Sequence, residues 1–521
     1  MASSTDSPMM RFLRKLAHTI YARPAWFVYP QIFLFLFGVA YTVKKLEFDT
    51  NRDNLVGSDK KYHQNFLKFQ KEFEAQGDLV VIVESEEMEK NRQFVERLGA
   101  KLEKETNLFA GVFYKGDLKM LGQKALLFVP VKDLEELHKT LGDFRPFVNQ
   151  FTRATNLESF FALINTQFRT AKQEKNAEND SLVKALPAVE RIVDQARENL
   201  LRPGNAPSPG LNALFGGGNE AERQMYITFA DGRLYLVTTH AREGMDGEKV
   251  VNRLRQLIQE TKLEVPGLNV GLTGEPVLEY DEMAQSQKDS TLASIVALIL
   301  CALIFIYGYS ETRRPLMATL CLLIGLGYTM FFTTLTVGHL NILTITFVPI
   351  LIGLAIDFGV HLITRYEEEI ARGRTQLEAI EKALVNTGMG VLTGALTTAG
   401  AFLAMALTNF KGIQEMGWIC GGGMILCLVP MMTLLPIMLL RAPQKPKEKI
   451  KPPKSELRQR IENIWLDHPW AAVGVTGALC VLAWAQSSKI YFDYDLLNMQ
   501  SKDLPSVVFE KKLLGSADKS L

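Results

Sequence analysis

The chain has 521 residues, of which 47% are hydrophobic and 22% are charged, and its formal net charge is +1. This balance supplies no excess basic charge for nucleic acid, and the sequence contains no phosphate-binding G-x-x-x-x-G-K-[ST] motif. H-E-x-x-H and G-x-S-x-G motifs are also absent. We therefore expect no enzyme, no cofactor, no nucleotide and no nucleic-acid partner.

All cysteines lie inside apolar segments, which argues against disulfides and against a zinc site. They are Cys301, Cys321, Cys420, Cys427 and Cys480. No metal is predicted.

The N-terminal residues 1–23 alternate basic and apolar side chains, as is typical of a cytoplasmic amphipathic helix on a membrane surface. The apolar run that follows, residues 24–43, is long enough to span a bilayer. A cleaved signal peptide is the alternative. No small-x-small cleavage site follows the run, so a retained transmembrane helix is favoured.

Residues 44–290 have the composition of a water-soluble domain. The pattern predicts a strand, a helix and a strand at 79–83, 91–106 and 108–114. A helical insertion over about 131–200 and a Gly/Pro-rich loop come next. A hairpin at 226–238, a helix at 248–261 and a strand at 268–272 then complete one or two small α/β sandwiches.

Apolar runs then return and predict a five-helix transmembrane bundle within residues 291–440. A basic linker at 441–468 precedes a seventh span at 469–488. The resulting fold class is a polytopic α-helical membrane protein with seven predicted spans and an α/β domain between spans 1 and 2. The positive-inside rule places the basic segments in the cytoplasm and residues 44–290 on the opposite side.

A short amphipathic helix is predicted on the cytoplasmic face, beginning near Thr375. Thr375 and Glu378 have the spacing of a capping box, and apolar residues follow at helical intervals. A connecting helix is favoured over a regulatory element.

Asp357 is the residue of the membrane segment that most requires explanation. The stretch from Asn341 to Ile356 carries no charge, and Asp357 follows after about 25 Å of helix. A carboxylate at that depth costs a few kcal/mol or more unless it is paired, hydrated or protonated. Burial raises a carboxyl pKa, so Asp357 is predicted to take up and release a proton.

Three further polar residues are candidates for the same proton relay. His361 lies one helical turn after Asp357 and could share its proton, although a hydrated histidine at the membrane edge is the simpler interpretation. Thr393 and Thr397 of the fifth span are the expected hydrogen-bonding neighbours of the carboxylate, with helix packing as an equal alternative. A buried structural Asp357, bonded to these threonines, is the alternative to a proton carrier.

Glycines are predicted to allow close helix packing around the relay, chiefly Gly353, Gly359 and Gly394. No residue of the outer domain is distinguished as a substrate contact.

The two ends of the chain repeat each other. Phe48-Asp49 and Asn54 recur as Phe492-Asp493 and Asn498, each 444 residues later and each following a span. We therefore expect a duplicated protein of which residues 489–521 begin a second outer domain.

One span, a large outer domain, five clustered spans and the start of a repeat resemble the resistance-nodulation-division (RND) superfamily. Gly353 to Asp357 matches its fourth-span G-x-x-x-D pattern, and Asp357-Phe358 stands where the MMPL (mycobacterial-membrane-protein-large) branch usually has Asp-Tyr. The stretch from Leu272 to Tyr280 is similar to the hopanoid-transporter members of that branch. Phe358 departs from the pattern and weakens a hydroxyl-mediated relay at that position.

The resemblance implies a secondary active transporter of the bacterial inner membrane with a large periplasmic domain. Protons flowing inward would drive export of a hydrophobic lipid, a hopanoid or a related molecule, and Asp357 would work with counterparts in a tenth span. Its partners would be membrane lipids, the lipid substrate and protons, and a homodimer or homotrimer stays open. A sterol-sensing-type regulator or scaffold and an accessory of protein secretion are the alternatives; an ATP-driven pump is disfavoured.

Overall fold

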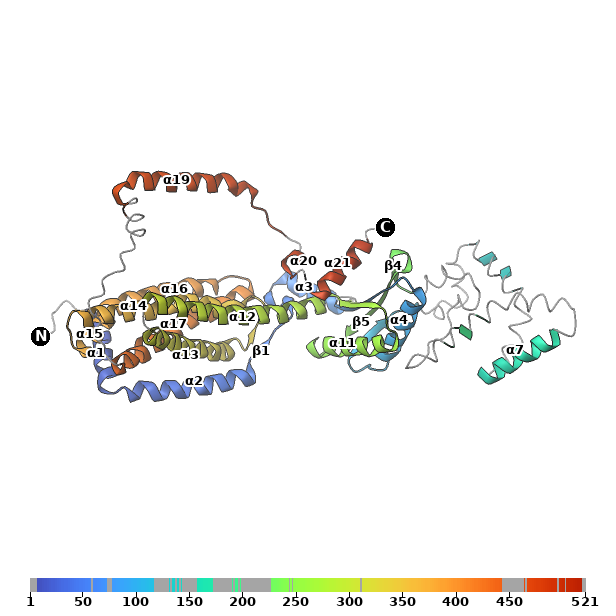
Figure 1. The fold of residues 1–521 in the computed structure, drawn as a ribbon, viewed down its shortest axis with the longest axis horizontal. Helices are drawn as coiled ribbons and strands as arrows, with labels where there is room; N and C mark the ends of the chain where they lie inside the picture. The colour runs from blue at the N-terminus through green and yellow to red at the C-terminus, as the bar shows by residue number, and fades with distance from the viewer. Residues whose placement is uncertain are drawn as a thin grey trace. The chain divides into compact units, whose positions relative to one another are not determined.

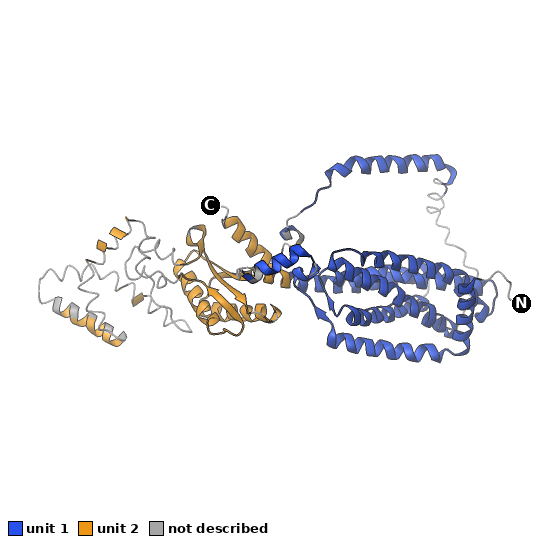
Figure 2. Cartoon of the chain, turned by 180° about the vertical axis from the view of Figure 1, so that it is seen from behind, with its two compact units in different colours: residues 1–72, 282–499 blue, residues 73–281, 500–521 orange. Residues whose placement is uncertain are grey.

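The computed structural model describes residues 7–57, 60–72, 77–116, 157–171, 226–242, 247–309, 312–442, 466–493, 496–501 and 503–517, with a few isolated residues between these ranges (Figure 1). The chain forms two compact units, shown in Figure 2. Unit 1 comprises residues 1–72 and 282–499, and unit 2 comprises residues 73–281 and 500–521.

Within these described ranges, seven helices are long and apolar enough to span a membrane, which confirms the predicted fold class. They are α2 (Ala25–Lys45), α12 (Glu275–Tyr309), α13 (Arg313–Thr336), α14 (Phe347–Ala371), α15 with α16 (Gln376–Lys382 and Gly388–Met405), α17 (Lys411–Arg441) and α19 (Pro469–Gln486). Helix α12 begins 16 residues before the predicted bundle boundary at 291, and the border between the two units falls within it. Hydropathy marks only its apolar part.

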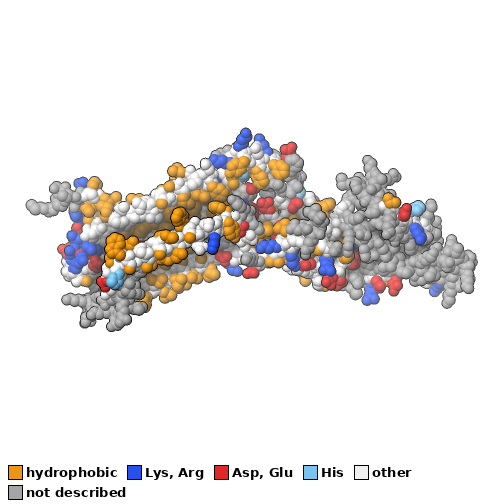
Figure 3. All heavy atoms as spheres, turned by 90° about the horizontal axis from the view of Figure 1, so that it is seen from above, with side chains coloured by type: hydrophobic (Ala, Val, Ile, Leu, Met, Phe, Trp, Pro, Cys, Tyr) orange, Lys and Arg blue, Asp and Glu red, His pale blue; other side chains and the backbone are white. Residues whose placement is uncertain are grey.

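Small residues bring the helices of unit 1 close together. A β-carbon at Gly325 of α13 would lie 2.8 Å from the Cα of Cys427 on α17, and one at Gly423 would lie 2.6 Å from the Leu351 side chain. Close backbone approach of this kind is how membrane helices gain packing energy. Exposed hydrophobic side chains line the long helices in the view of Figure 3.

A buried polar cluster joins three spans inside this core. Gln31 of α2 donates its amide to Thr433 Oγ1 of α17 at 2.9 Å, and the Tyr328 hydroxyl of α13 donates to the Gln31 carbonyl at 2.9 Å. Because unpaired polar groups are costly in lipid, these bonds fix the first span against the bundle. No pattern in the sequence predicted this cluster.

Unit 2 is built on an antiparallel sheet. Its strands are β2 (Asp78–Glu84), β3 (Phe109–Phe113), β4 (Thr228–Phe229), β5 (Leu234–Ala241) and β6 (Asn269–Thr273). The order is β3-β5-β2-β6, with β4 paired to β5, so the predicted hairpin is confirmed and the strands form a single sheet. The predicted helical insertion lies largely outside the described residues, apart from α7 (Leu157–Ala171).

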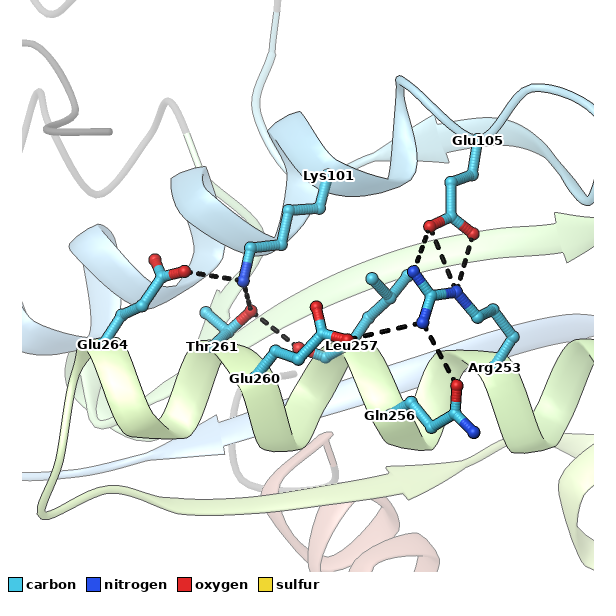
Figure 4. Close-up of polar contacts among 8 residues, drawn as sticks. All are labelled: Lys101, Glu105, Arg253, Gln256, Leu257, Glu260, Thr261 and Glu264. Atoms are coloured by element: carbon cyan, nitrogen blue, oxygen red, sulfur yellow. Dashed lines mark hydrogen bonds and ion pairs between the residues drawn. The ribbon is translucent and has the colours of Figure 1, made fainter. Parts of the chain in front are cut away.

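Two helices cover one face of that sheet, α4 (Met88–Leu102) and α11 (Gly247–Glu264). Their buried residues include Phe94, Leu98 and Leu254, packed against strand residues such as Val81. Ion pairs and hydrogen bonds link α11 to α4 and to the segment that follows α4 (Figure 4). Arg253 of α11 contacts Glu105 at 2.5 Å, and Lys101 of α4 contacts Glu264 at 2.8 Å.

The opposite face of the sheet packs against α21 (Pro505–Ala517), which comes from the far end of the chain. Phe509 joins a hydrophobic cluster with Ile82, Leu234 and Leu236. Ser506 donates to Asp281 at 2.7 Å, and Lys512 pairs with Glu84 at 2.6 Å. Residues 500–517, expected from the repeat to begin a second outer domain, thus pack within unit 2; whether such a domain follows stays a prediction.

The repeat itself is visible as local structure. Asn54 donates its side-chain amide to Asp49 at 2.9 Å, and Asn498 donates in the same way to Asp493 at 3.2 Å. The same asparagine-to-aspartate hydrogen bond therefore forms in both copies of the repeat.

Unit 1 also contains α1 (Pro8–Ala22), and α15 belongs to the same unit. The Thr375–Glu378 capping box is present, which confirms that prediction. Between α15 and α16 lies η5 (Ala383–Thr387), a turn of π-helix. The short strands β1 (Glu47–Phe48) and β7 (His339–Leu340) pair in parallel elsewhere in unit 1.

Candidate proton site in the fourth span

Helix α14 separates its buried residues from a polar stripe. Ala355, Ile356 and Phe358 are buried against the bundle, whereas Asp357 and His361 are exposed. Residues four apart lie on one face of a helix, which brings the carboxylate and the imidazole onto the same stripe. Exposed here means that no described part of the chain covers them.

A second stripe of small and polar residues runs along the neighbouring helix α16, which contacts α14. Thr393, Gly394 and Thr397 are exposed, while Val391 and Ala395 are buried. The structure thus brings the sequence-predicted relay residues to two adjacent helices, each on a face that the described residues leave open.

The expected hydrogen bonds between the threonines and Asp357 are not formed in the described residues. Thr393 donates to the Met389 carbonyl at 2.9 Å, and Thr397 donates to the Gly394 carbonyl at 3.0 Å. Both hydroxyls thus donate to backbone carbonyls of their own helix, as serine and threonine commonly do in helices. Within the described residues Asp357 has neither a hydrogen bond nor an ion pair, and Cys301 of α12 lies within electrostatic range of it.

The glycines that were expected to pack near the relay divide into two groups. Gly359 is packed, because a β-carbon there would lie 3.0 Å from Ala318 and 3.2 Å from Met431. A β-carbon at Gly353 or at Gly394 would have no atom of the described residues within 4 Å. Close helix packing at Gly353 and Gly394 therefore stays a prediction.

Two hydroxyl groups extend the α14 stripe and were missed in the sequence. Tyr309, at the end of α12, donates to the Val360 carbonyl at 3.0 Å and shares a hydrogen bond of 2.5 Å with Thr364. Thr364 is three residues beyond His361, so Asp357, His361 and Thr364 follow one another along the same side of the helix. Their i, i+4, i+7 spacing was available as a signal, but the position of Tyr309 depends on tertiary packing.

Several ion pairs surround the C-terminal end of α14, beyond Thr364. Arg314 of α13 pairs with Glu367 at 2.5 Å, and both side chains are largely buried. Glu369, fully buried, pairs with Arg365 at 2.7 Å, Arg372 at 2.6 Å and Arg374 at 2.7 Å. These pairs fix the geometry of the helix end next to Thr364.

A separate ionic cluster lies just before the start of α14, around the loop between the third and fourth spans. Glu415 of α17 contacts His339 at 3.3 Å and accepts a hydrogen bond of 2.7 Å from Asn341. The bond to Glu415 raises the pKa of His339, with smaller contributions from the charges of Glu415 and Asp49; burial and Lys411 oppose the shift. This cluster joins the loop to α17.

In the part of the chain that the structure describes, seven candidate spans and a separate α/β unit define a multi-pass membrane protein, and its fourth span carries a carboxylate on an open face. A family model described as the MMPL family matches residues 135–475, which is well over half of the chain. The chain belongs to the MMPL family.

Individual relatives are distant. The chain is similar to the hopanoid transporter HpnN of Rhodopseudomonas palustris (strain TIE-1), with 24% identity covering 91% of this chain and 54% of the relative. It is 23% identical to HpnN of Burkholderia multivorans, covering 80% and 47%. A stretch covering 47% of the chain is 25% identical to 36% of the apo-petrobactin exporter of Bacillus anthracis. The chain thus spans about half the length of the hopanoid transporters it matches.

Proposed function

We propose that this protein is a secondary active transporter that uses an inward proton flow to export a hydrophobic lipid from the bacterial inner membrane. Asp357 carries the proposal, because its carboxylate has no partner among the described residues that would offset the cost of placing a charge on a membrane helix. Membership of the MMPL family and similarity to proteins named hopanoid transporters support a hopanoid or related lipid as substrate.

In this proposal Asp357 receives a proton from the periplasmic side and loses it toward the cytoplasm. His361 is the next group along the stripe, and the Thr364–Tyr309 hydroxyl pair follows it. Imidazole and hydroxyl groups can accept and donate protons, so this order forms a stepwise path away from Asp357. The hydroxyls of Thr393 and Thr397 would join the relay only after rotating away from their backbone acceptors.

Unit 2 would then be periplasmic, as the basic cytoplasmic segments require. Unit 2 would carry the lipid away from the membrane as the bundle responds to protonation of Asp357. No chemical step on the substrate is involved.

The test is transport by the intact protein in proteoliposomes with a labelled hopanoid and an imposed pH gradient. We expect the gradient to accelerate lipid movement and Asp357→Asn to abolish the acceleration. Glu368→Gln removes an exposed acid from the same helix and serves as the matched control. Lipid movement that ignores the gradient in the unmodified protein would overturn the proposal and favour a sterol-sensing-type or secretion-accessory module.

A further inference from the structure

A turn of π-helix lies directly before the helix that carries Thr393 and Thr397. It spans Ala383–Thr387, and the Gly388 amide donates to the Ala383 carbonyl, five residues back. Such turns are rare, and they occur frequently at functional sites. A π turn contains one residue more than an α-helical turn. Its position along the helix therefore determines which way the side chains that follow it point about the helix axis.

The register matters because each residue of an α-helix corresponds to a rotation of about 100°. If the π turn moved along α16 past Thr393, that side chain would turn by about 100° about the helix axis. Thr393 now lies on the open face, while Val391 and Ala395 are buried. The location of the π turn therefore decides which side chains α16 presents on the open face beside α14.

Helix α1 packs on this π turn and on α15, beside which it lies in Figure 1. Leu13, Ala17 and Ile20 are buried, and α1 contacts α15, η5 and α16. A β-carbon at Gly388 would lie 4.0 Å from the Leu13 side chain and 3.0 Å from Met432. The apolar face of α1, expected from the sequence to lie on the membrane surface, is thus turned toward the bundle.

An ion pair holds α1 at this position. Arg14 Nε lies 3.0 Å from Glu381 Oε1, and His18 Nε2 lies 3.3 Å from Glu381 Oε2. Glu381 lies two residues before the π turn. Both oxygens of its carboxylate therefore contact α1 next to the point where the π turn begins. Lys15, the neighbouring basic residue of α1, is exposed.

We infer that Arg14 and Glu381 form a positioning pair for the proton site. The pair holds α1 on the π turn, which keeps the turn at Ala383–Thr387 and keeps Thr393 and Thr397 on the face beside Asp357. The effect of this pair on proton flow rests on the proposed function. Its effect on the direction in which the side chains of α16 point does not.

The experiment combines charge reversal with cysteine accessibility in the intact protein. Arg14→Glu, Glu381→Arg and the double exchange are compared with Lys15→Glu, which makes the same change on the exposed side of α1. In a background without native cysteines, single cysteines at positions 391–398 are labelled with a water-soluble maleimide in membrane vesicles. Gradient-driven proton flux and its pH profile are measured in parallel.

We expect Arg14→Glu to move maleimide labelling from position 393 to an adjacent position and to lower proton flux by about fivefold or more, the lower range of couplings between distant sites. The pH profile should shift with it. The double exchange should restore the labelling pattern, the flux and the pH profile, and Lys15→Glu should leave all three unchanged.

An unmoved labelling pattern in Arg14→Glu would overturn the inference, even if flux fell. If Arg14→Glu does not fold, as judged by size-exclusion chromatography, Arg14→Gln and Glu381→Gln decide the question by the same criterion. Absence of gradient-driven flux in the unmodified protein would count against the proposed function alone, because the labelling pattern needs no transport.

Discussion

Phe509 of α21 lies directly over Gly271 of β6, so closely that a β-carbon at position 271 would overlap its ring. The strand lacks a side chain at the place where the helix needs room. Thr273, two residues on, adds a hydrogen bond of 2.7 Å to Glu510. The segment that follows the seventh span is therefore fitted to a sheet whose strands precede the bundle in sequence.

Disrupting this fit should destabilise unit 2. Phe509→Ala removes a buried ring and should cost about 3 kcal/mol, the range for large-to-small changes in a core. Gly271→Val should act in the same direction by forcing α21 away from the sheet. Val508→Ala, at a more exposed position of the same helix, is the control. Limited proteolysis should cut unit 2 faster in the first two variants; equal rates in all three would show that α21 does not stabilise the sheet.

The buried bond between Tyr328 and Gln31 should contribute measurably to the stability of unit 1. Tyr328→Phe leaves the Gln31 carbonyl without this donor and should cost about 1 kcal/mol. Thermal unfolding in detergent measures the loss, and Tyr21→Phe, which removes an exposed hydroxyl, should leave the midpoint unchanged. Identical midpoints for both variants would contradict a stabilising role for the cluster.

The His339–Glu415 pair predicts a dependence of stability on pH. The pKa of His339 is raised above its ordinary value of 6.5 because the protonated ring bonds to Glu415. The folded state therefore binds this proton more tightly than the unfolded state does. The stabilisation is fully present below about pH 6.5 and is lost as the pH rises through the raised pKa.

Comparison of His339→Gln with the unmodified protein tests this dependence. The difference between their unfolding midpoints should be larger at about pH 6 than at a pH above the raised pKa, where the histidine is neutral in both states. His468→Gln, at an exposed position, is the control. A difference that does not change with pH would show that the charge on His339 is unimportant.

Tyr309 tests the cytoplasmic part of the proposed path. Tyr309→Phe keeps the ring and removes the hydroxyl that bonds to Thr364 and the Val360 carbonyl. We expect gradient-driven proton flux to fall by about tenfold, within the range that a positioned proton-transfer group supplies, while the protein stays folded. Tyr307→Phe removes the hydroxyl of a strongly exposed neighbour on α12 and should be neutral. Equal flux in the two variants would exclude Tyr309 from the path.

The sequence predicted those features that depend on local pattern. Apolar runs of bilayer length identified the seven spans, and short apolar runs identified the strands of unit 2. The placement of Asp357 and His361 on one face followed from their spacing of four residues alone.

Features that depend on distant contacts were not predictable in this way. Gln31 and Tyr328 are 297 residues apart, and neither is distinguished by its neighbours in sequence. The π turn before α16 is packed against α1 and α14, and no residue type marks it in the sequence. The expected bonds from Thr393 and Thr397 to Asp357 failed because a hydroxyl on a helix has a backbone acceptor within reach.

In the proposed function Asp357 carries the transported proton. The most direct measurement is proton uptake into proteoliposomes that contain the intact protein and a trapped pH-sensitive dye, after a sudden pH step. We expect rapid uptake by the unmodified protein and by Glu368→Gln, partial uptake by Asp357→Glu, and none above the lipid background by Asp357→Asn. Uptake by Asp357→Asn at the unmodified rate, with the protein folded and inserted, would contradict it.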